Sequence, residues 1–553
     1  MINFYPWFRL DSLNAFIVLA IGLFSLLVIV YSARFRFIRR RIALQYYICI
    51  ILTALASIIT VLANNLILLL VCWGFLGLTL YLLINLGDVG SETAAKKTFI
   101  IVGGSDAFLL LGIAIIYHLT DSLQMDQIKI YLDARPLSLS VIAYLCIAVA
   151  CFAKAGAMPF HSWIPDCAES APVPVVAYLP ASLDKLLGIY LLVRFSLDLF
   201  VMNEAMNTLL MVIGAFTIVA AVMMALIQHN IKRLLGYHAV SQVGYMVLGI
   251  GTGSPLGIAG GIFHMLNHAI YKSCLFLTVG NIEAKTGTVD LARLGGLAKS
   301  MPFTYISCLV ASLSISGVPP FNGFFSKWMI YQELIQKINI RQWSVVSLAC
   351  LVAAMFGSGL TLASFMKLMH ATFLGQRANK STSQQSKDVA WTMWLPCIIL
   401  AVICIIFGIF ASQIPLRYFI LPAIGKIDFI GIWYPGLSTL LIIVGLLVGI
   451  IIFKFKDIKP IWRQDKSFTG AETQDYKLQR ISGTDFYNTI KELGVLKTIY
   501  KKAEAGTFDI YEQGKTLIFT IGRIFQYLHN GVLPTYLVWG LLGMLGLFLV
   551  LLR

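Results

Sequence analysis

The chain has 553 residues, of which 59% are hydrophobic and only 12% are charged. Soluble domains carry about 25% charged residues. A mean hydropathy of +0.83 over this length therefore excludes a soluble enzyme, a disordered chain and a secreted disulfide scaffold. The composition predicts an all-α polytopic membrane protein. The formal net charge of +16 is better explained by basic cytoplasmic loops than by nucleic-acid binding.

About fourteen apolar stretches are long enough to cross a bilayer as helices. They lie at residues 13–32, 44–62, 65–86, 94–118, 138–164, 171–196, 206–229, 238–253, 256–280, 302–337, 344–374, 391–413, 430–454 and 533–552. Two of them are broken, because 138–164 contains Pro159 and 302–337 contains Pro319 and Pro320. In lipid such breaks persist only where protein or a water-filled cavity satisfies the freed backbone groups, and they mark ion paths in transporters.

The polar and apolar stretches predict four parts. Residues 1–454 form a transmembrane bundle, 455–483 a cytoplasmic linker, 484–530 a lateral helix, and 531–553 a C-terminal transmembrane anchor. In the lateral helix, apolar residues recur at helical spacing between lysines, which is typical of an amphipathic helix lying on a membrane surface. Gly506, Gly514 and Gly522 are candidate interruptions.

The distribution of Lys and Arg predicts the orientation in the membrane. Fourteen spans place both termini on one side. If that side is the outside, the short inside segments hold more than twice as many Lys and Arg residues as the outside segments. The positive-inside rule then predicts a multi-pass protein of the cell inner (cytoplasmic) membrane. Both termini face outside and the lateral helix lies on the cytoplasmic side.

Four lysines, Lys154, Lys185, Lys272 and Lys327, lie deep within predicted spans. A lysine at such depth costs several kcal/mol and is a functional candidate by default. Burial disfavours its charged form and a nearby carboxylate favours it, so a lysine between these influences can load and release a proton. The alternative is four structural salt bridges. Three further cations near helix ends, Arg194, Lys337 and Lys367, are interpreted as snorkelling residues with a structural role.

His264 and His268 precede Lys272 at spacings of four, which places all three on one helix face. Imidazoles titrate near neutrality, as a proton path requires. No third ligand accompanies the histidines, so no metal site is expected. The carboxylates within spans are Asp106 and Asp184. The ten cysteines contain no CxxC pair, which predicts neither an iron–sulfur cluster nor structural zinc, and no cofactor in this chain.

Several motifs surround these residues. They are Phe8-Arg9-Leu10-Asp11-Ser12-Leu13-Asn14, Ala153-Lys154-Ala155-Gly156, Pro159-Phe160-His161-Ser162-Trp163, Leu183-Asp184-Lys185, Ser241-Gln242-Val243-Gly244-Tyr245, Asn267-His268-Ala269-Ile270-Tyr271-Lys272, and Gly317-Val318-Pro319-Pro320 with Ser326-Lys327. With them, roughly residues 8–375 resemble the antiporter-like subunits of respiratory complex I, of membrane-bound hydrogenases and of Mrp-type cation/proton antiporters.

The resemblance implies a role for each site residue. Lys154 would be the central proton-loading lysine. Lys327 would be the distal lysine, opening to the outside, and lysine at this position resembles the terminal, L-type subunit. The residues implied as the linking relay are Lys185, His264, His268 and Lys272. The resemblance also implies other antiporter-like and small membrane subunits as partners, the lipid bilayer around them, and a peripheral redox arm as an indirect partner.

One departure concerns the carboxylate that tunes the central lysine. The family usually has Trp-Glu where this chain has Trp73-Gly74, and that glutamate pairs with the central lysine. We expect Asp184 to replace it, because Asp184 lies on the span after the Lys154 helix and consecutive spans are often neighbours. Asp106 is the second choice. In the alternative interpretation, Asp184 only neutralises a local lysine.

Two functions follow as alternatives. The first is a proton-translocating, itself non-catalytic subunit of a redox-driven complex, similar to NADH or ferredoxin:quinone oxidoreductases or to group 4 hydrogenases. The second is a subunit of an Mrp-like Na⁺/H⁺ antiporter, or of an inorganic-carbon uptake pair, without electron transfer. A purely structural scaffold does not explain four deep lysines.

Overall fold

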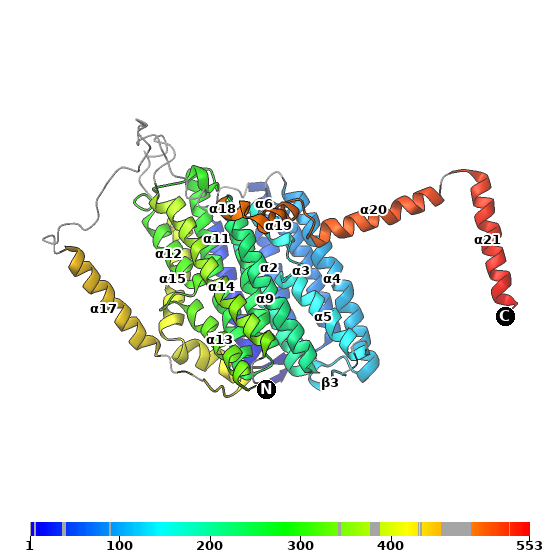
Figure 1. The fold of residues 1–553 in the computed structure, drawn as a ribbon, viewed down its shortest axis with the longest axis horizontal. Coiled ribbons are helices and arrows are strands. Elements are labelled where there is room, and N and C mark those ends of the chain that lie inside the picture. Colours follow the sequence, from blue (N-terminus) through cyan, green and yellow to red (C-terminus); the bar gives the residue numbers. More distant parts are fainter. Residues whose placement is uncertain are drawn as a thin grey trace. The chain divides into compact units, whose positions relative to one another are not determined.

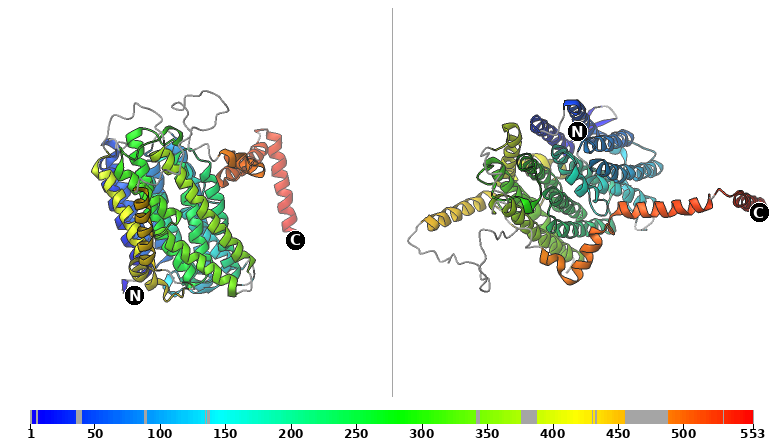
Figure 2. Two further views of the ribbon diagram at one scale, coloured as in Figure 1. Left: turned by 60° about the vertical axis from the view of Figure 1, so that its left-hand side comes forward. Right: turned by 90° about the horizontal axis from the view of Figure 1, so that it is seen from above.

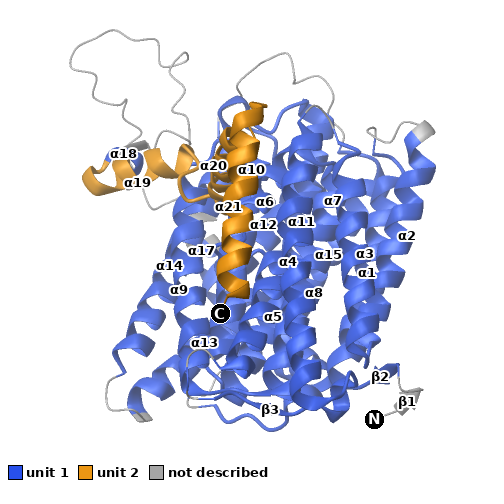
Figure 3. Ribbon diagram, turned by 90° about the vertical axis from the view of Figure 1, so that its right-hand side faces the viewer, with its two compact units in different colours: residues 1–492 blue, residues 493–553 orange. Residues whose placement is uncertain are grey.

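The computed structural model describes the chain except residues 1, 5–6, 36–39, 88–89, 134, 136–137, 341–343, 376–387, 430, 432–433, 455–487, 530 and 553. The chain divides into two compact units, residues 1–492 and 493–553, each coloured separately in Figure 3. The predicted linker 455–483 lies outside the described residues.

In the first unit most of the long helices run side by side as a bundle, and α17 (Pro435–Lys454) slants away from them (Figures 1 and 2). The other unbroken long helices of this unit are α1 (Ser12–Ser32), α2 (Arg40–Leu62), α3 (Leu66–Ile84), α4 (Ser91–Thr120), α9 (Glu204–Leu226), α10 (Ile231–Gly251), α11 (Pro255–Thr286), α14 (Val345–Met369) and α15 (Trp391–Ile409). Side chains before several of them cap the first turn, as Asp11 does by accepting from the backbone N–H groups of Leu13 and Asn14. Nearly every residue of α10 and α11 is buried, so these two helices form the centre of the bundle.

Each of the fourteen predicted stretches contains helix, and most of their residues are apolar. Among the described residues, nine helical segments are both long and apolar enough to cross a membrane. Three apolar helices are shorter, at Leu139–Ala155, Pro302–Ser316 and Pro435–Gly449. The chain is therefore a polytopic helical membrane protein.

Both predicted helix breaks are present. The first separates α5 (Leu139–Ala155) from α6 (Trp163–Ser170), and the second separates α12 (Pro302–Ser316) from α13 (Asn322–Ile340). Each first half ends at a glycine with positive φ, +80° at Gly156 and +78° at Gly317, a conformation that glycine adopts without steric cost. The breaks free backbone carbonyl groups near the centre of the bundle.

A segment of mixed helical type carries Asp184 and Lys185. It begins with α7 (Val173–Tyr178), widens into a π-helical turn η2 (Leu179–Leu183), continues as α8 (Asp184–Arg194) and ends in a second π-helical turn, η3 (Phe195–Leu199). A π-turn inserts one residue per turn and so rotates the side chains that follow it. Asp184 and Lys185 come directly after η2.

Short elements connect the long helices. Strand β1 (Ile2–Phe4) pairs antiparallel with β2 (Phe8–Leu10), with Ile2 opposite Leu10, and β3 (Ile130–Tyr131) pairs parallel with β4 (Phe200–Val201). The remaining elements are η1 (Met125–Gln127), η4 (Leu291–Arg293), η5 (His370–Leu374), η7 (Ser412–Ile420), α16 (Leu421–Ile424) and α18 (Asn488–Glu492).

The second unit holds α19 (Gly494–Glu504), α20 (Ile510–Leu528) and α21 (Leu533–Leu551). The described part of the predicted lateral helix is therefore interrupted rather than continuous. It breaks at Leu493 and again after Glu504, where Gly506 has a φ of +75° and Asp509 caps α20. Gly514 and Gly522 lie inside α20, because an isolated glycine is tolerated within a helix. No described residue of α20 or α21 is buried.

Candidate functional site

The four lysines singled out from the sequence are all inside the bundle. The side chains of Lys154, Lys185 and Lys272 are 0% exposed, and that of Lys327 is 2% exposed. They come from four different helices, α5, α8, α11 and α13. The ammonium groups of Lys154, Lys185 and Lys272 have no hydrogen-bond partner among the described residues. Burying a charged ammonium in this way is costly, because the group loses its hydration and gains no hydrogen bond in return.

Lys154 lies near the end of α5, just before the break at Gly156. Its Nζ lies 5.0 Å from the ring centroid of Trp73 on α3. The charges that act on it are Asp184 first and Asp106 second, and neither carboxylate forms an ion pair with it within 4.0 Å. The two carboxylates expected to tune Lys154 are therefore both electrostatic neighbours rather than direct partners.

Two glycines of α3 lie beside Asp106. A Cβ at Gly74 would lie 3.9 Å from Asp106 Oδ2, and a Cβ at Gly77 would lie 3.8 Å from the same oxygen. The other oxygen of Asp106 is buried and has no hydrogen-bond partner in the described part of the chain. The carboxylate of Asp106, on α4, thus occupies the space beside the position where the sequence lacks a glutamate.

Lys185 and Asp184 connect the first broken helix to the rest of the site. The Nζ of Lys185 lies 5.6 Å from the ring centroid of Trp163, and it would lie 3.4 Å from a Cβ at Gly156. Asp184 interacts electrostatically with both Lys154 and Lys185. The Trp163 indole N–H donates to the Ala153 carbonyl oxygen at 2.9 Å, which satisfies a carbonyl group at the break.

The histidine helix α11 continues the row. Both ring nitrogens of His268 are buried without a hydrogen-bond partner among the residues described, and its electrostatic neighbours include Lys272 and Lys185. Its ring centroid lies 5.5 Å from that of Tyr271. The Tyr271 hydroxyl lies 3.4 Å from His264 Nε2, so a polar side chain stands between the two histidines.

His264 contacts Ser326, the residue next to Lys327, which is the last lysine of the row. The Nδ1 of His264 lies 2.9 Å from Ser326 Oγ, and its Nε2 lies 3.1 Å from Gln242 Oε1. Ser326 precedes Lys327, whose Nζ donates to the Ile315 carbonyl oxygen at 2.9 Å, just before the second break. The predicted residues therefore lie together inside the bundle as a buried row, in which Lys185 and the α11 residues are linked by electrostatic interaction. The sequence did not single out Gln242, Tyr271 or Ser326 as site residues, although their polarity within buried helices was a usable signal.

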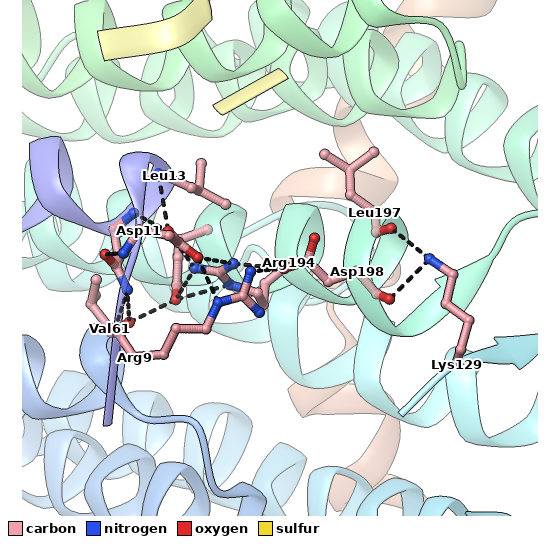
Figure 4. A network of polar contacts seen from close by, with 10 residues as sticks. Arg9, Asp11, Leu13, Val61, Lys129, Arg194, Leu197 and Asp198 are labelled. Atoms are coloured by element: carbon pink, nitrogen blue, oxygen red, sulfur yellow. Dashed lines mark hydrogen bonds and ion pairs between the residues drawn. The ribbon is translucent and has the colours of Figure 1, made fainter. Parts of the chain in front are cut away.

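An ion-pair network ties the opposite end of α8 to the start of α1 (Figure 4). The Arg194 guanidinium lies 2.7 Å from Asp11 Oδ2 and 2.6 Å from Asp198 Oδ2, and Arg9 Nε lies 2.9 Å from Asp11 Oδ2. Burial opposes the ionisation of Asp11, but the hydrogen bond and charge of Arg194 outweigh it and lower the pKa of Asp11. Arg194 is thus a buried, paired cation. The prediction that it snorkels to the membrane surface is wrong, although its role is structural as expected.

The end of the bundle at the α9–α10 turn carries a second set of ion pairs. Lys97 lies 2.6 Å from Asp166 Oδ2, and Lys232 lies 2.7 Å from Glu283 Oε1. These four residues line a cavity of about 440 Å³. Lys367 is also buried here, and its Nζ donates to the carbonyl oxygens of Leu226 and Gln228 at the end of α9. It caps that helix instead of reaching solvent.

A membrane-embedded helix bundle with two broken helices and a buried Lys/His row defines an antiporter-like membrane subunit. Residues 63–373, more than half of the chain, match the family described as NADH:quinone oxidoreductase/Mrp antiporter, TM. The chain belongs to this family, as the motifs in its sequence predicted.

Curated relatives include components of two kinds of complex. A putative antiporter component of Staphylococcus saprophyticus is 31% identical over 76% of this chain and 54% of its own length. Hydrogenase-4 component B of Escherichia coli K12 is 30% identical over 72% of this chain and 62% of its own length. The chain thus spans between about half and two thirds of the length of these relatives.

Two solved structures share the fold. A chain of the membrane-bound sulfane sulfur reductase, an archaeal respiratory membrane complex, superimposes with a TM-score of 0.79 at 23% identity, covering 98% of this chain and 89% of that one. A chain of the Mrp complex from Dietzia superimposes with a TM-score of 0.67, also at 23% identity, covering 75% of this chain and 84% of that one.

Proposed function

We propose that this chain translocates protons across the cytoplasmic membrane as one subunit of a larger membrane complex. The observation that carries the proposal is the buried row that runs from Lys154 through Lys185 and Lys272 to Lys327. Burial without an ion pair removes the strong preference of an ammonium group for its charged form, which allows a proton to be lost and regained along the row. The histidines of α11 and the hydroxyls beside them provide the intermediate steps.

We further propose that Asp184 sets the charge of Lys154. It lies in the first turn of α8 and acts on both Lys154 and Lys185, and its Oδ2 is buried without a hydrogen-bond partner among the described residues. A carboxylate shared by two lysines favours one protonated lysine over two, and so couples their proton occupancy. Asp106 supplies a second negative charge from the side of Trp73.

Two processes are candidates for the energy source that is coupled to proton translocation. In the first candidate, a partner reaction that transfers electrons drives translocation, and the name of the Escherichia coli relative, hydrogenase-4 component B, favours it. In the second, Na⁺ exchange drives or consumes the proton flow, and a Bacillus subtilis relative that is named as part of a Na⁺/H⁺ antiporter favours it. Co-purification of redox subunits with this chain supports the first candidate. Proton movement that requires Na⁺ and no electron donor supports the second.

The proposed setting is a complex of antiporter-like and small membrane subunits, with both termini of this chain outside. The amphipathic helices α19 and α20 then lie on the cytoplasmic surface. The basic residues at the α9–α10 turn, such as Lys232 and Arg233, support this orientation.

The test of translocation uses sealed vesicles that contain the assembled complex. We expect Lys154→Ala and Lys327→Ala each to abolish proton transport, measured with a pH-sensitive dye, while the complex still assembles. Alanine has no titratable group, so neither position can bind a proton in these variants. Lys337→Ala is the matched control, because Lys337 lies near the end of the same helix α13 and outside the row, and it should transport at the wild-type rate. Full transport by either deep-lysine variant would refute the relay.

A further inference from the structure

A second polar branch meets the buried row at Lys272. His238 on α10 is fully buried, and its Nε2 lies 2.7 Å from Ser364 Oγ on α14. The His238 ring packs against Phe365 with ring centroids 4.8 Å apart. The Nζ of Lys272 lies 5.9 Å from the centroid of the same Phe365 ring. His238 and Lys272 are thus neighbours around one aromatic side chain.

From Ser364 the branch leads to the end of the bundle at the α9–α10 turn. Lys367 follows Ser364 by almost one helical turn, and its Nζ donates to the carbonyl oxygens of Leu226 at 2.6 Å and Gln228 at 2.9 Å. Gln228 is partly exposed in that turn. His238 lies eight residues along from Asn230, the cap of α10, which at 1.5 Å per residue is roughly 12 Å into the bundle.

The second ring nitrogen of His238 bears on whether this histidine carries protons or only joins α10 to α14 by a hydrogen bond. Its Nδ1 is buried and has no hydrogen-bond partner among the described residues. The charged groups that act on His238 are Lys272, Lys367 and Lys327. A histidine that only joined α10 to α14 would need one nitrogen, whereas a histidine that passes a proton uses both.

We propose that His238, Ser364 and Lys367 form a proton branch that connects Lys272 to the α9–α10 end of the bundle. The proposal rests on the proposed function, since it supplies an entrance to the same row. A proton passes from Ser364 Oγ to His238 Nε2 while the proton on Nδ1 leaves toward neutral Lys272, and the Lys367 ammonium returns a proton to Ser364. One proton enters and one leaves, so the net charge of His238 and Ser364 is unchanged. The ring is then the Nε2–H tautomer, and a ring flip restores the Nδ1–H form before the next proton.

The experiment measures proton movement in vesicles that contain the assembled complex. His238→Asn keeps an amide that can bond Ser364 but carries no titratable group, and we expect transport at least tenfold slower. Ser241→Ala is the matched control, because Ser241 makes a buried bond from the same helix to the Ile218 carbonyl oxygen at 3.0 Å. It should stay within twofold of the wild type. In His238→Ala, imidazole added at the α9–α10 side should restore transport.

Three results would overturn the branch: wild-type transport by His238→Asn, an equal loss in Ser241→Ala, or no effect of imidazole on inactive His238→Ala. If His238→Asn does not assemble, Ser364→Ala carries the same expectation of a tenfold loss, and wild-type transport by it overturns the branch. The deep-lysine variants separate the two proposals. Inactive Lys154→Ala together with fully active His238→Asn removes the branch alone, whereas active Lys154→Ala removes the relay itself.

Discussion

At the scale of single residues, the proposed relay requires each buried lysine to lie near the balance between its charged and neutral forms. Lys154 faces the Trp73 ring at 5.0 Å and two carboxylates beyond ion-pair distance. A direct ion pair would hold the lysine charged, and a wholly apolar pocket would hold it neutral. The observed distances avoid both extremes. The same reasoning applies to Lys185, which faces Trp163 and follows Asp184 in the chain.

The two carboxylates make separable predictions. Asp184→Asn removes the charge shared by Lys154 and Lys185, and we expect proton transport in vesicles to fall by about a hundredfold, as for loss of a positioned proton-transfer group. Asp106→Asn removes the weaker neighbour of Lys154, and we expect a smaller loss of transport than in Asp184→Asn. Transport by Asp184→Asn at the wild-type rate would contradict its role as the main partner of Lys154.

Gly74 allows a sharper version of this test. A side chain at position 74 would begin 3.9 Å from the Asp106 carboxylate, which is ordinary contact distance. Adding Gly74→Glu to Asp106→Asn should therefore return a carboxylate to the same space and restore most of the lost transport. Gly74→Gln in the same background has equal size and no charge, and should restore nothing. Equal rescue by both would show that packing, and not charge, is what Asp106 contributes.

At the scale of elements, the two broken helices place lysines beside glycines with positive φ. At Gly317 an added Cβ would lie 3.1 Å from Lys327 Cδ. The new residue would also have to adopt the left-handed backbone conformation, which costs roughly 1–2 kcal/mol. Gly317→Ala should therefore displace the Lys327 chain, lower thermal stability in detergent and slow proton transport together.

The control for this prediction is Gly22→Ala in α1, where a Cβ would meet nothing within 4 Å. Alanine is the better helix former, so this variant should be as stable as the wild type or slightly more stable. Unchanged melting temperature and transport in Gly317→Ala would show that the break does not constrain Lys327.

At the scale of the whole molecule, the chain consists of a bundle with a buried centre and a second unit with almost no buried surface. Tyr500 is the buried residue of α19, and α20 and α21 have none among the described residues. Exposed apolar helices of this length need lipid or other membrane chains around them. We therefore expect the second unit to contact lipid or other membrane subunits and to act in assembly.

A truncated chain tests that role. A protein ending at Glu492 should keep the helix content and melting temperature of the bundle, because the deleted unit contributes no part of the buried row. It should lose co-purification with other membrane subunits. The control is Tyr500→Ala in the full-length chain, which disturbs the buried residue of α19 without deleting the unit. It should still co-purify with the other membrane subunits. Full co-purification of the truncated chain would contradict the assembly role.

The sequence by itself determined the membrane class, the helical stretches, both helix breaks and the buried residues of the row. These follow from hydropathy, from proline and glycine, and from the high cost of a charge in lipid, which are local properties of the chain. The motifs also identified the family. Position 74 showed in the sequence alone that the usual glutamate was missing.

Only the tertiary structure decided which residues meet across helices. Gly74 and Gly77 lie beside the Asp106 carboxylate because α3 packs against α4, and His238 meets Ser364 because α10 lies against α14. Arg194 is paired with Asp11 and does not snorkel, since residues 183 positions apart come together at the end of α8. Of the three glycines that the sequence offered as interruptions of the lateral helix, only Gly506 adopts a positive φ, of +75°, while Gly514 and Gly522 lie within α20. Helical periodicity assigns a face to each residue but not the neighbour on the facing helix, and the polar contacts of this site are contacts between helices.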